Sequence, residues 1–271
     1  MEHPFTTLSP FRYPGGKSWL RRTVIDWIEH LPRRPTILIE PFAGGGSISL
    51  AVIQSDACDR AIMAEIDPEV AAVWQTILSD DFASLISMIR SFRLTRKNVK
   101  KLLNEDMGNI AETAFKCIVR NRVQRAGILA PGAGLLLNGE DGKGLHSRWY
   151  PRTLESRIEQ VRALAPRIEF IEGDGMAVLK RYKSNPKVTF FIDPPYVARN
   201  GGPGRRLYRY NSVNVESLFE ILSDVAGPFF LTLHEDDSVQ RLAKLYGFQV
   251  KELPMRTAHH TIKTELAITR R

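Results

Sequence analysis

The chain has 271 residues, of which 43% are hydrophobic and 25% charged, as in an ordinary soluble globular protein. Lysine and arginine number 38 against 30 acidic residues, and the formal net charge of +8 indicates a polyanionic partner or a solvated basic surface. Cys58 and Cys117 lie far apart and outside any Cys/His cluster, which argues against a zinc site and fits a reducing cytoplasm. With no signal-peptide pattern and no apolar run near the ~20 residues of a membrane span, we expect a soluble intracellular protein.

Short apolar runs alternate with helical patterns along most of the chain. The runs predict strands at 36–39, 61–64, 168–171, 188–192, 229–233, 248–253 and 266–269. The helical patterns lie at 70–78, 154–164, 215–225 and 238–246. This alternation predicts an α/β fold with a mostly parallel twisted sheet and helices on both faces. The last two strands are too close for a crossover helix, so we expect an antiparallel terminal hairpin.

Residues 80–150 break this alternation. The first part of the segment is helical and basic, and the second part, "LAPGAGLLLNGEDGKGLHSRWYPR", is rich in glycine. We therefore expect a helical domain at 80–150 that is inserted into a catalytic domain formed by 1–79 and 151–271.

Several strand ends carry residues suited to a ligand site. "EPFAGGGS" places Gly44 and Gly46 at a strand-to-helix turn, where a ligand could approach the backbone or where the helix merely packs tightly. Glu65 ends the second strand, where a carboxylate can accept hydrogen bonds from ribose hydroxyls or start a helix, although Asp67 suits helix capping better. Asp174 could face a purine or cap the helix that follows it, and the sequence favours neither.

The strand at 188–192 ends in an acid, two prolines and a tyrosine, Asp193-Pro194-Pro195-Tyr196. Proline cannot donate to a sheet ladder, so both prolines must lie beyond the strand. Asp193 and Tyr196 are therefore expected at the carboxyl edge of the sheet, where open α/β sheets bind their ligands. A stiff strand-to-loop turn is the simpler alternative for this segment taken alone.

The order of these motifs resembles the Dam-type adenine-specific DNA methyltransferases. The resemblance is carried by "FRYPGGK", "EPFAGGGS", "AEID", "GD" and "DPPY", and the ending "MRTAHHTIKTELAIT" is similar to the terminal hairpin of that family. It implies a class I, Rossmann-like methyltransferase fold, S-adenosylmethionine as methyl donor without a metal, and double-stranded DNA whose target adenine is flipped out. It is also compatible with a restriction endonuclease partner and with a DNA-associated protein of a prokaryotic cell or phage.

The resemblance assigns roles residue by residue. The carboxylate of Asp193 and the carbonyl of Pro194 would accept the two N–H groups of the target amine, Pro195 would hold that carbonyl in place, and Tyr196 would stack on the base. The residues expected around S-adenosylmethionine are Tyr13, Gly16, Lys17, Phe42, Gly44, Gly46, Glu65, Asp174 and Asp193. Lys17 could reach a carboxylate of the methionine moiety or lie near Asp193 as a point charge.

DNA contacts are expected from the basic insertion. Arg120, Arg122 and Arg125 are candidates for phosphate or guanine contacts, with a solvated helix face as the alternative. A second group, Arg199, Arg205, Arg206 and Arg209, lies in a Gly-rich loop that could contact phosphates or remain in solvent. His259 and His260 have no partner cluster in the sequence, so we interpret them as surface or DNA-facing residues. The segment after the insertion helix departs from the usual family pattern, so the resemblance does not extend to the recognised sequence.

Two rivals to adenine methylation in DNA follow from the same residues. The acceptor geometry would serve any exocyclic amine, so methylation of cytosine or of RNA is the nearest enzymatic alternative. A non-catalytic DNA-binding protein with the same fold is the alternative from another class. The intact Asp193-Pro194-Pro195-Tyr196 motif argues against it, because a protein that only binds DNA has no need of the acid.

Overall fold

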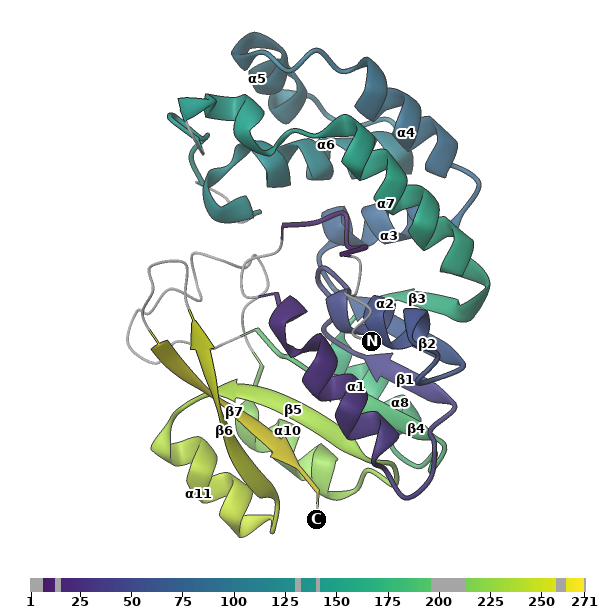
Figure 1. The fold of residues 1–271 in the computed structure, drawn as a ribbon, viewed down its shortest axis with the longest axis vertical. Coiled ribbons are helices and arrows are strands. Elements are labelled where there is room, and N and C mark those ends of the chain that lie inside the picture. The colour runs from purple at the N-terminus through teal and green to yellow at the C-terminus, as the bar shows by residue number, and fades with distance from the viewer. Residues whose placement is uncertain are drawn as a thin grey trace, which may run out of the picture.

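The computed structural model describes residues 7–12, 16–129, 133–139, 142–195, 213–256 and 262–270. Figure 1 shows a lower lobe built around a β-sheet and an upper lobe built from helices. The chain enters the upper lobe after the second strand and returns to the sheet with the third strand.

The lower lobe contains a seven-stranded sheet in the order β3-β2-β1-β4-β5-β7-β6. The strands are β1 (Ile37–Glu40), β2 (Arg60–Glu65), β3 (Ile168–Glu172), β4 (Val188–Ile192), β5 (Phe229–His234), β6 (Gln249–Arg256) and β7 (Ile262–Thr269). The first five strands run parallel, whereas β7 lies antiparallel between β5 and β6. The predicted mostly parallel α/β sheet with an antiparallel terminal hairpin is confirmed.

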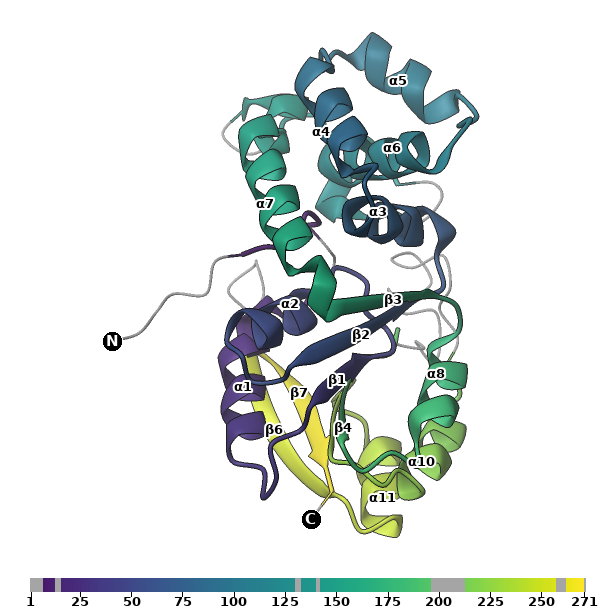
Figure 2. The ribbon, with the colours of Figure 1, turned by 90° about the vertical axis from the view of Figure 1, so that its right-hand side faces the viewer.

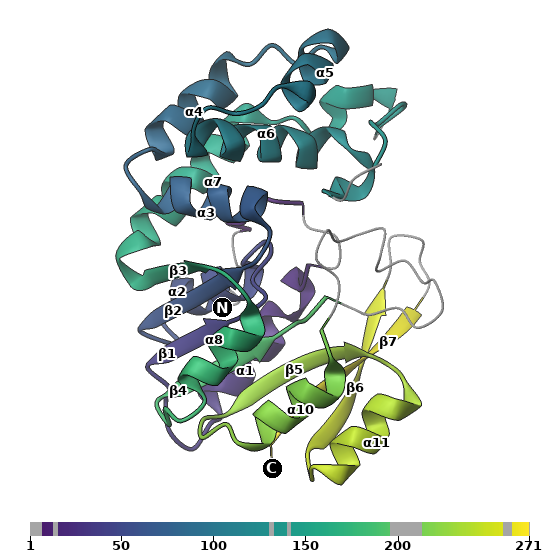
Figure 3. The same cartoon turned by 180° about the vertical axis from the view of Figure 1, so that it is seen from behind.

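Helices cover both faces of the sheet, as Figure 2 shows with the sheet seen along its edge. One face is covered by α1 (Arg21–Glu29) and α2 (Ser47–Gln54), whose apolar residues pack on central strands. The other face, turned toward the viewer in Figure 3, carries α8 (Gly175–Tyr182), α10 (Val215–Ser223) and α11 (Asp237–Leu245). Because both faces are covered, β4 is fully buried and reads as a continuous apolar run.

In the described residues, the upper lobe contains five α-helices and short turns. They are α3 (Pro68–Leu78), α4 (Phe82–Ser91), α5 (Arg96–Asn104), α6 (Ile110–Val123) and α7 (Pro151–Leu164). Side chains of Asp67, Thr95 and Asn109 cap the first turns of α3, α5 and α6, which explains where these helices begin. One apolar cluster joins α3 and α7 to the helices between them, so the helical core extends on both sides of the segment 80–150. None of the described helices is long and apolar enough to cross a membrane.

Candidate active site

Three acids meet at the carboxyl edge of the parallel strands. Glu40 is the last residue of β1, Glu65 is the last residue of β2, and Asp193 directly follows β4. Since β1 pairs with both β2 and β4, the ends of these strands are neighbours in the sheet. The sheet topology therefore gathers acids that lie far apart in the sequence at the edge where α/β sheets bind ligands.

A buried charge cluster lies at the end of β4. The ammonium of Lys17 lies 2.9 Å from Oδ1 of Asp193 and 3.0 Å from Oε1 of Glu265 in β7. Lys17 is 4% exposed and Glu265 is 1% exposed, whereas Asp193 is 19% exposed. Thr232 in β5 donates its hydroxyl to the same Oδ1 of Asp193 at 2.9 Å. Two donors from different elements therefore fix the orientation of the Asp193 carboxylate.

The pKa of Lys17 follows from its neighbours. Burial lowers this pKa, but the opposing charges of Asp193 and Glu265 and their hydrogen bonds outweigh burial, so the pKa is raised above its usual value. Lys17 directly precedes a short helical turn at Ser18–Leu20 and the helix α1, where the positive end of the backbone dipole disfavours a cation. The carboxylates of Asp193 and Glu265 therefore favour the charged form of Lys17 at this position. The interpretation of Lys17 as a point charge near Asp193 agrees with this geometry.

Pro194 is buried and Pro195 is half-buried, directly after Asp193. Two consecutive prolines restrict the backbone, so the carbonyl of Pro194, one residue after Asp193, has little conformational freedom. Tyr196, which the sequence places next, lies outside the described residues, as does Tyr13. Gly16 is described and exposed, one residue before Lys17.

The Gly-rich turn after β1 adopts a conformation that requires glycine. Gly44 and Gly46 have φ angles of 48° and 60°, in the left-handed region. A Cβ atom on Gly46 would lie 2.9 Å from the ring of Trp74 and 2.5 Å from Met63. The indole N–H of Trp74 in turn donates to the carbonyl of Gly44 at 2.8 Å. The buried Trp74 thus packs against the Gly-rich turn at the start of α2 and donates a hydrogen bond to it.

Glu65 also hydrogen-bonds to the Gly-rich turn. Its carboxylate accepts hydrogen bonds from the backbone N–H of Gly44 at 3.0 Å and from those of Ile66 and Asp67 at 2.9 Å each. Burial raises the pKa of Glu65 to about 7, against the lowering effect of these N–H groups. Capping of α3 belongs to Asp67, which accepts from the N–H of Glu69 at 2.9 Å. Glu65 therefore connects the second strand to the Gly-rich turn rather than capping the helix.

Asp174 follows β3 and lies at the start of α8. It is exposed, and its Oδ1 accepts from the N–H of Met176 at 3.0 Å, so the side chain caps α8. Next to it, Gly175 packs so closely that a Cβ atom would lie 2.3 Å from the carbonyl of Pro41 and 2.7 Å from the Phe42 ring. Phe42 and Asp174 are thereby brought to the same edge as the Gly-rich turn.

Glu40 is a site residue that the sequence analysis did not single out. It is 4% exposed and accepts a hydrogen bond from the backbone N–H of Ser49 at 2.9 Å. Burial raises its pKa to about 8, and the nearby negative charge of Asp193 adds to this effect. The signal was present, because Glu40 ends an apolar strand in the same way as Glu65. Glu265 was missed for a different reason, since its neighbours in "TELAIT" indicate only the edge of a strand.

The candidate DNA contacts in α6 need a correction. Arg122 is 4% exposed, and its guanidinium donates to the carbonyl of Pro10. Arg120 is 13% exposed and forms an ion pair with Glu69 of α3. The burial of Arg122 excludes it as a DNA contact, whereas Arg120 is partly exposed and its DNA contact stays a prediction. Arg125, in the turn after α6, is exposed and remains a candidate.

Arg122 also lies near other guanidinium groups. Burial lowers its pKa to about 9, and the positive charges of Arg157, Arg12 and Arg148 contribute to that shift. The second group of predicted DNA contacts, Arg199, Arg205, Arg206 and Arg209, lies outside the described residues together with His259 and His260. Across the part of the chain that is described, no group of three or more His, Cys, Asp or Glu residues could hold a metal ion.

The segment 7–12 connects the Gly-rich turn to the upper lobe. Ser9 donates its hydroxyl to the carbonyl of Gly45, and Arg157 of α7 donates to the carbonyl of Ser9 at 3.1 Å. The buried Asn121 accepts from the N–H of Arg12 at 2.9 Å and donates to the carbonyls of Arg12 and Gly127 at 3.1 and 2.9 Å. Asn121 thereby fixes the backbone of Arg12, at the start of the FRYPGGK motif, against the turn that carries Arg125.

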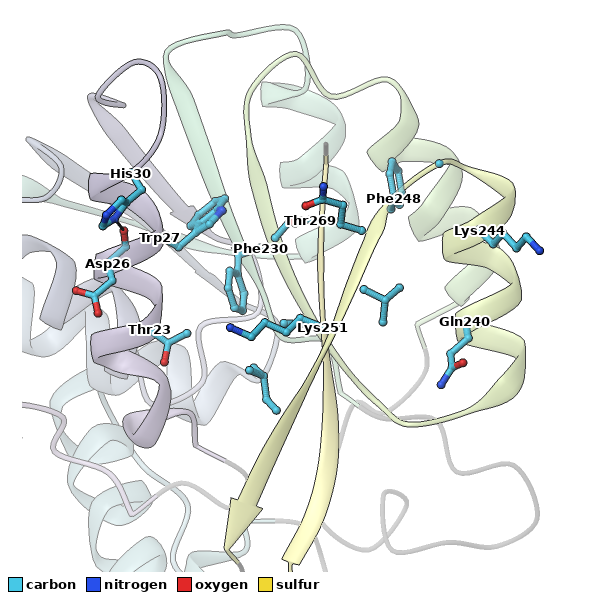
Figure 4. Close-up of a pocket in the computed structure, with 15 residues that line it drawn as sticks. Thr23, Asp26, Trp27, His30, Phe230, Gln240, Lys244, Phe248, Lys251 and Thr269 are labelled. Carbon is cyan, nitrogen blue, oxygen red and sulfur yellow. Dashed lines mark hydrogen bonds between the residues drawn. The ribbon is translucent and has the colours of Figure 1, made fainter.

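A separate groove of about 960 Å³ lies between α1 and the terminal hairpin (Figure 4). Its lining includes Trp27, Phe230 and Lys251, with the rings of Trp27 and Phe230 5.4 Å apart at an edge-on angle. Phe230 is near the beginning of β5 and Thr269 ends the antiparallel β7. The groove therefore lies toward the amino edge of the parallel strands, away from Asp193.

Comparison with known proteins gives a family match over most of the chain. A family model described as D12 class N6 adenine-specific DNA methyltransferase matches residues 13–227. Among the solved structures that match is the rRNA methyltransferase aviRa from Streptomyces viridochromogenes, at 16% identity and a TM-score of 0.43, over 96% of this chain and 86% of that one. Another is precorrin-6y C5,15-methyltransferase from Geobacter metallireducens, at 11% identity and a TM-score of 0.39, over 93% and 86%. No curated protein sequence matches.

Proposed function

The chain belongs to the D12 class of N6 adenine-specific DNA methyltransferases, and on that basis we propose that it methylates the exocyclic amine of adenine in double-stranded DNA. S-adenosylmethionine is the methyl donor that membership of this family implies. The observation that supports the proposal most strongly is the fixed carboxylate of Asp193, directly before two prolines at the carboxyl edge of the sheet.

The chemistry explains why an oriented acceptor is needed. The lone pair of an exocyclic amine is delocalised into the purine ring, so the nitrogen is a poor nucleophile. The Asp193 carboxylate and the Pro194 carbonyl would accept its two N–H groups and favour a tetrahedral nitrogen with a localised lone pair. Because Lys17 and Thr232 hold Asp193 before any substrate arrives, this acceptor is preorganised, which is the arrangement that lowers a reaction barrier.

The described residues suit S-adenosylmethionine. The glycines of the turn after β1 leave no side chain over the start of α2, and the buried carboxylate of Glu65 ends the neighbouring strand. We assign the ribose hydroxyls to Glu65, the floor of the site to Phe42, Gly44 and Gly46, and the adenine ring to the region of Asp174. When bound, the donor supplies a methyl group that its sulfonium already activates. Arranging the amine is then left to residues of the chain.

DNA is the polyanion that would balance the net charge of +8. The exposed Arg125 lies in the turn that Asn121 fixes to Arg12, at the start of the FRYPGGK motif. A DNA contact at Arg125 would therefore be coupled to the active-site edge. The domain division into a catalytic part at 1–79 and 151–271 and a recognition part at 80–150 is included in this proposal.

Substitution of Asp193 tests the proposed function directly. We expect Asp193→Ala to abolish methyl transfer to genomic DNA from a host without methyltransferases, while the dissociation constant for S-adenosylmethionine changes by no more than a few-fold. The matched control is Asp224→Ala, which removes an exposed acid that only pairs with Lys183. Appreciable turnover by Asp193→Ala would refute this role for the acid. If the wild-type protein methylated cytosine in the DNA, or RNA offered as a separate substrate, the alternative substrates would be favoured.

A further inference from the structure

We propose that Glu265 is a positioning residue for the transfer step, because it shares the ammonium of Lys17 with Asp193. The inference rests on the proposed role of Asp193. It goes further by extending the active site to the terminal hairpin, since Glu265 belongs to β7 and is separated from β4 by the whole of β5.

Lys17 lies between the carboxylates of Asp193 and Glu265. Lys17 Nζ lies 2.9 Å from Asp193 Oδ1 and 3.0 Å from Glu265 Oε1, so it bridges the two carboxylates almost evenly. Glu265 is 1% exposed, in register with His234 at the end of β5. A glutamate this deeply buried is uncommon unless it is paired, and Lys17 is the pairing that the structure shows at short range.

Glu265 also changes the net charge around Asp193. A buried ammonium opposite one carboxylate forms a neutral pair, and the acceptor strength of that carboxylate is then reduced by its partner. With Glu265 present, Lys17, Asp193 and Glu265 together carry one negative charge. Glu265 thus allows Lys17 to orient Asp193 without neutralising it. An acceptor for an amine benefits from both conditions, a fixed direction and a retained negative charge.

Glu265 also helps to keep Lys17 protonated. Among the described residues, the charged groups that face Lys17 include Asp193 and Glu265, and Glu40 interacts with Asp193 from the end of β1. Both carboxylates raise the pKa of Lys17 against the lowering effect of burial. Removing the charge of Glu265 leaves the desolvation of Lys17 opposed by one carboxylate, so Lys17 should lose its proton at a lower pH in the variant than in the wild type.

The test compares Glu265→Gln with Glu252→Gln, measuring kcat, the dissociation constant of S-adenosylmethionine and the melting temperature. Glu252 is exposed in β6, beside β7, so its variant removes the same charge from the same hairpin. We expect Glu265→Gln to lower kcat roughly 10- to 100-fold, because a misplacement of about 1 Å in a reacting group can cost about 100-fold. The cofactor affinity should stay within a few-fold, and Glu252→Gln should match the wild type.

Two further readouts separate positioning from folding. The ratio of variant to wild-type kcat should fall as the pH rises from 7 to 10. Deprotonation of Glu40 near pH 8 would affect both proteins alike and leave this ratio unchanged. In addition, Lys17→Met/Glu265→Gln should be no less active than Lys17→Met alone, because Glu265 acts through Lys17. A pH-independent ratio, or additive losses in the double variant, would show that Glu265 only stabilises the hairpin. Turnover by Asp193→Ala would instead refute the proposed function itself.

Discussion

The carboxylate of Glu65 accepts a hydrogen bond from the backbone N–H of Gly44 at 3.0 Å, and so connects the second strand to the Gly-rich turn after the first. The buried indole of Trp74 donates to the carbonyl of the same glycine at 2.8 Å. Gly44 is thus held at both its N–H and its carbonyl. The turn that we assign to the methyl donor is therefore rigid before any ligand binds.

Glu65→Ala should weaken binding of S-adenosylmethionine by roughly 1–3 kcal/mol, the usual cost of leaving buried polar partners unsatisfied. The N–H groups of Gly44, Ile66 and Asp67 would lose their acceptor, and the ribose would lose its partner. Calorimetry measures the affinity. Glu169→Ala is the control, because it removes an acid from the neighbouring strand that pairs with an exposed arginine. Unchanged affinity in Glu65→Ala would reduce its role to supporting the turn.

Glu40 should make the protein less stable as the pH rises. Its pKa in the folded state is about 8, above the ordinary value of 4.5. The folded state therefore holds a proton that the unfolded state has lost between these values, and stability falls across this window. Each pKa unit corresponds to about 1.4 kcal/mol.

Glu40→Gln should remove much of this slope. Urea denaturation at pH 5 and pH 9 would measure it, and the variant should gain stability relative to the wild type at pH 9. Glu65 contributes a similar but smaller slope, because its pKa is raised to about 7. Equal slopes in wild type and variant would show that Glu40 does not hold its proton in the folded state.

Asn121→Ala should destabilise the protein and loosen the start of the FRYPGGK motif. The buried amide makes three hydrogen bonds, two to Arg12 and one to Gly127, and each buried group left without a partner costs roughly 1–3 kcal/mol. Hydrogen exchange at residues 8–12 would report the local effect. Asn98→Ala is a suitable control, because this partly exposed side chain bonds only to the nearby carbonyl of Arg93. Unaltered exchange would contradict the role assigned to Asn121.

The arginines of the insertion should divide into two groups. Arg125→Ala should weaken DNA binding and lower the salt dependence by about one unit if the residue contacts a phosphate. If it contacts guanine, the loss should be ~1–3 kcal/mol and confined to one position of the recognised sequence.

Arg120→Ala should instead lower the melting temperature, because it breaks the ion pair with Glu69. Binding to duplexes that differ by one base pair, at two salt concentrations, distinguishes these cases. Arg181→Ala, on the exposed last turn of α8, is the control. Equal DNA binding by Arg125→Ala and Arg181→Ala would move the contact elsewhere in the insertion.

The sequence predicts what depends on local pattern. The strand runs, the alternation with helices and the terminal hairpin are all present, because apolar periodicity and proline positions act locally. The carboxyl-edge position of Asp193 and Glu65 also follows from strand direction alone. Glu265 could not be connected to Lys17 and Asp193 in this way, because its contact requires β7 to insert beside β5.

For Arg122, the local sequence pattern does not predict the surroundings of the side chain. Its place in a basic run within α6 predicts a surface that contacts DNA, yet the carbonyl of Pro10 binds its guanidinium inside the protein. Whether an arginine faces solvent or a carbonyl depends on the segment that packs against its helix. Here that segment is the chain before the FRYPGGK motif, which lies far away in the sequence.

The most direct test of the central claim is to sequence DNA from a methylation-free host that expresses the protein, with a method that reports modified bases. We predict N6-methyladenine at a recurring short sequence with the wild-type protein, and unmodified DNA with Asp193→Ala expressed at the same level. Unmodified DNA with the wild type, or modification of cytosine instead, would contradict the account.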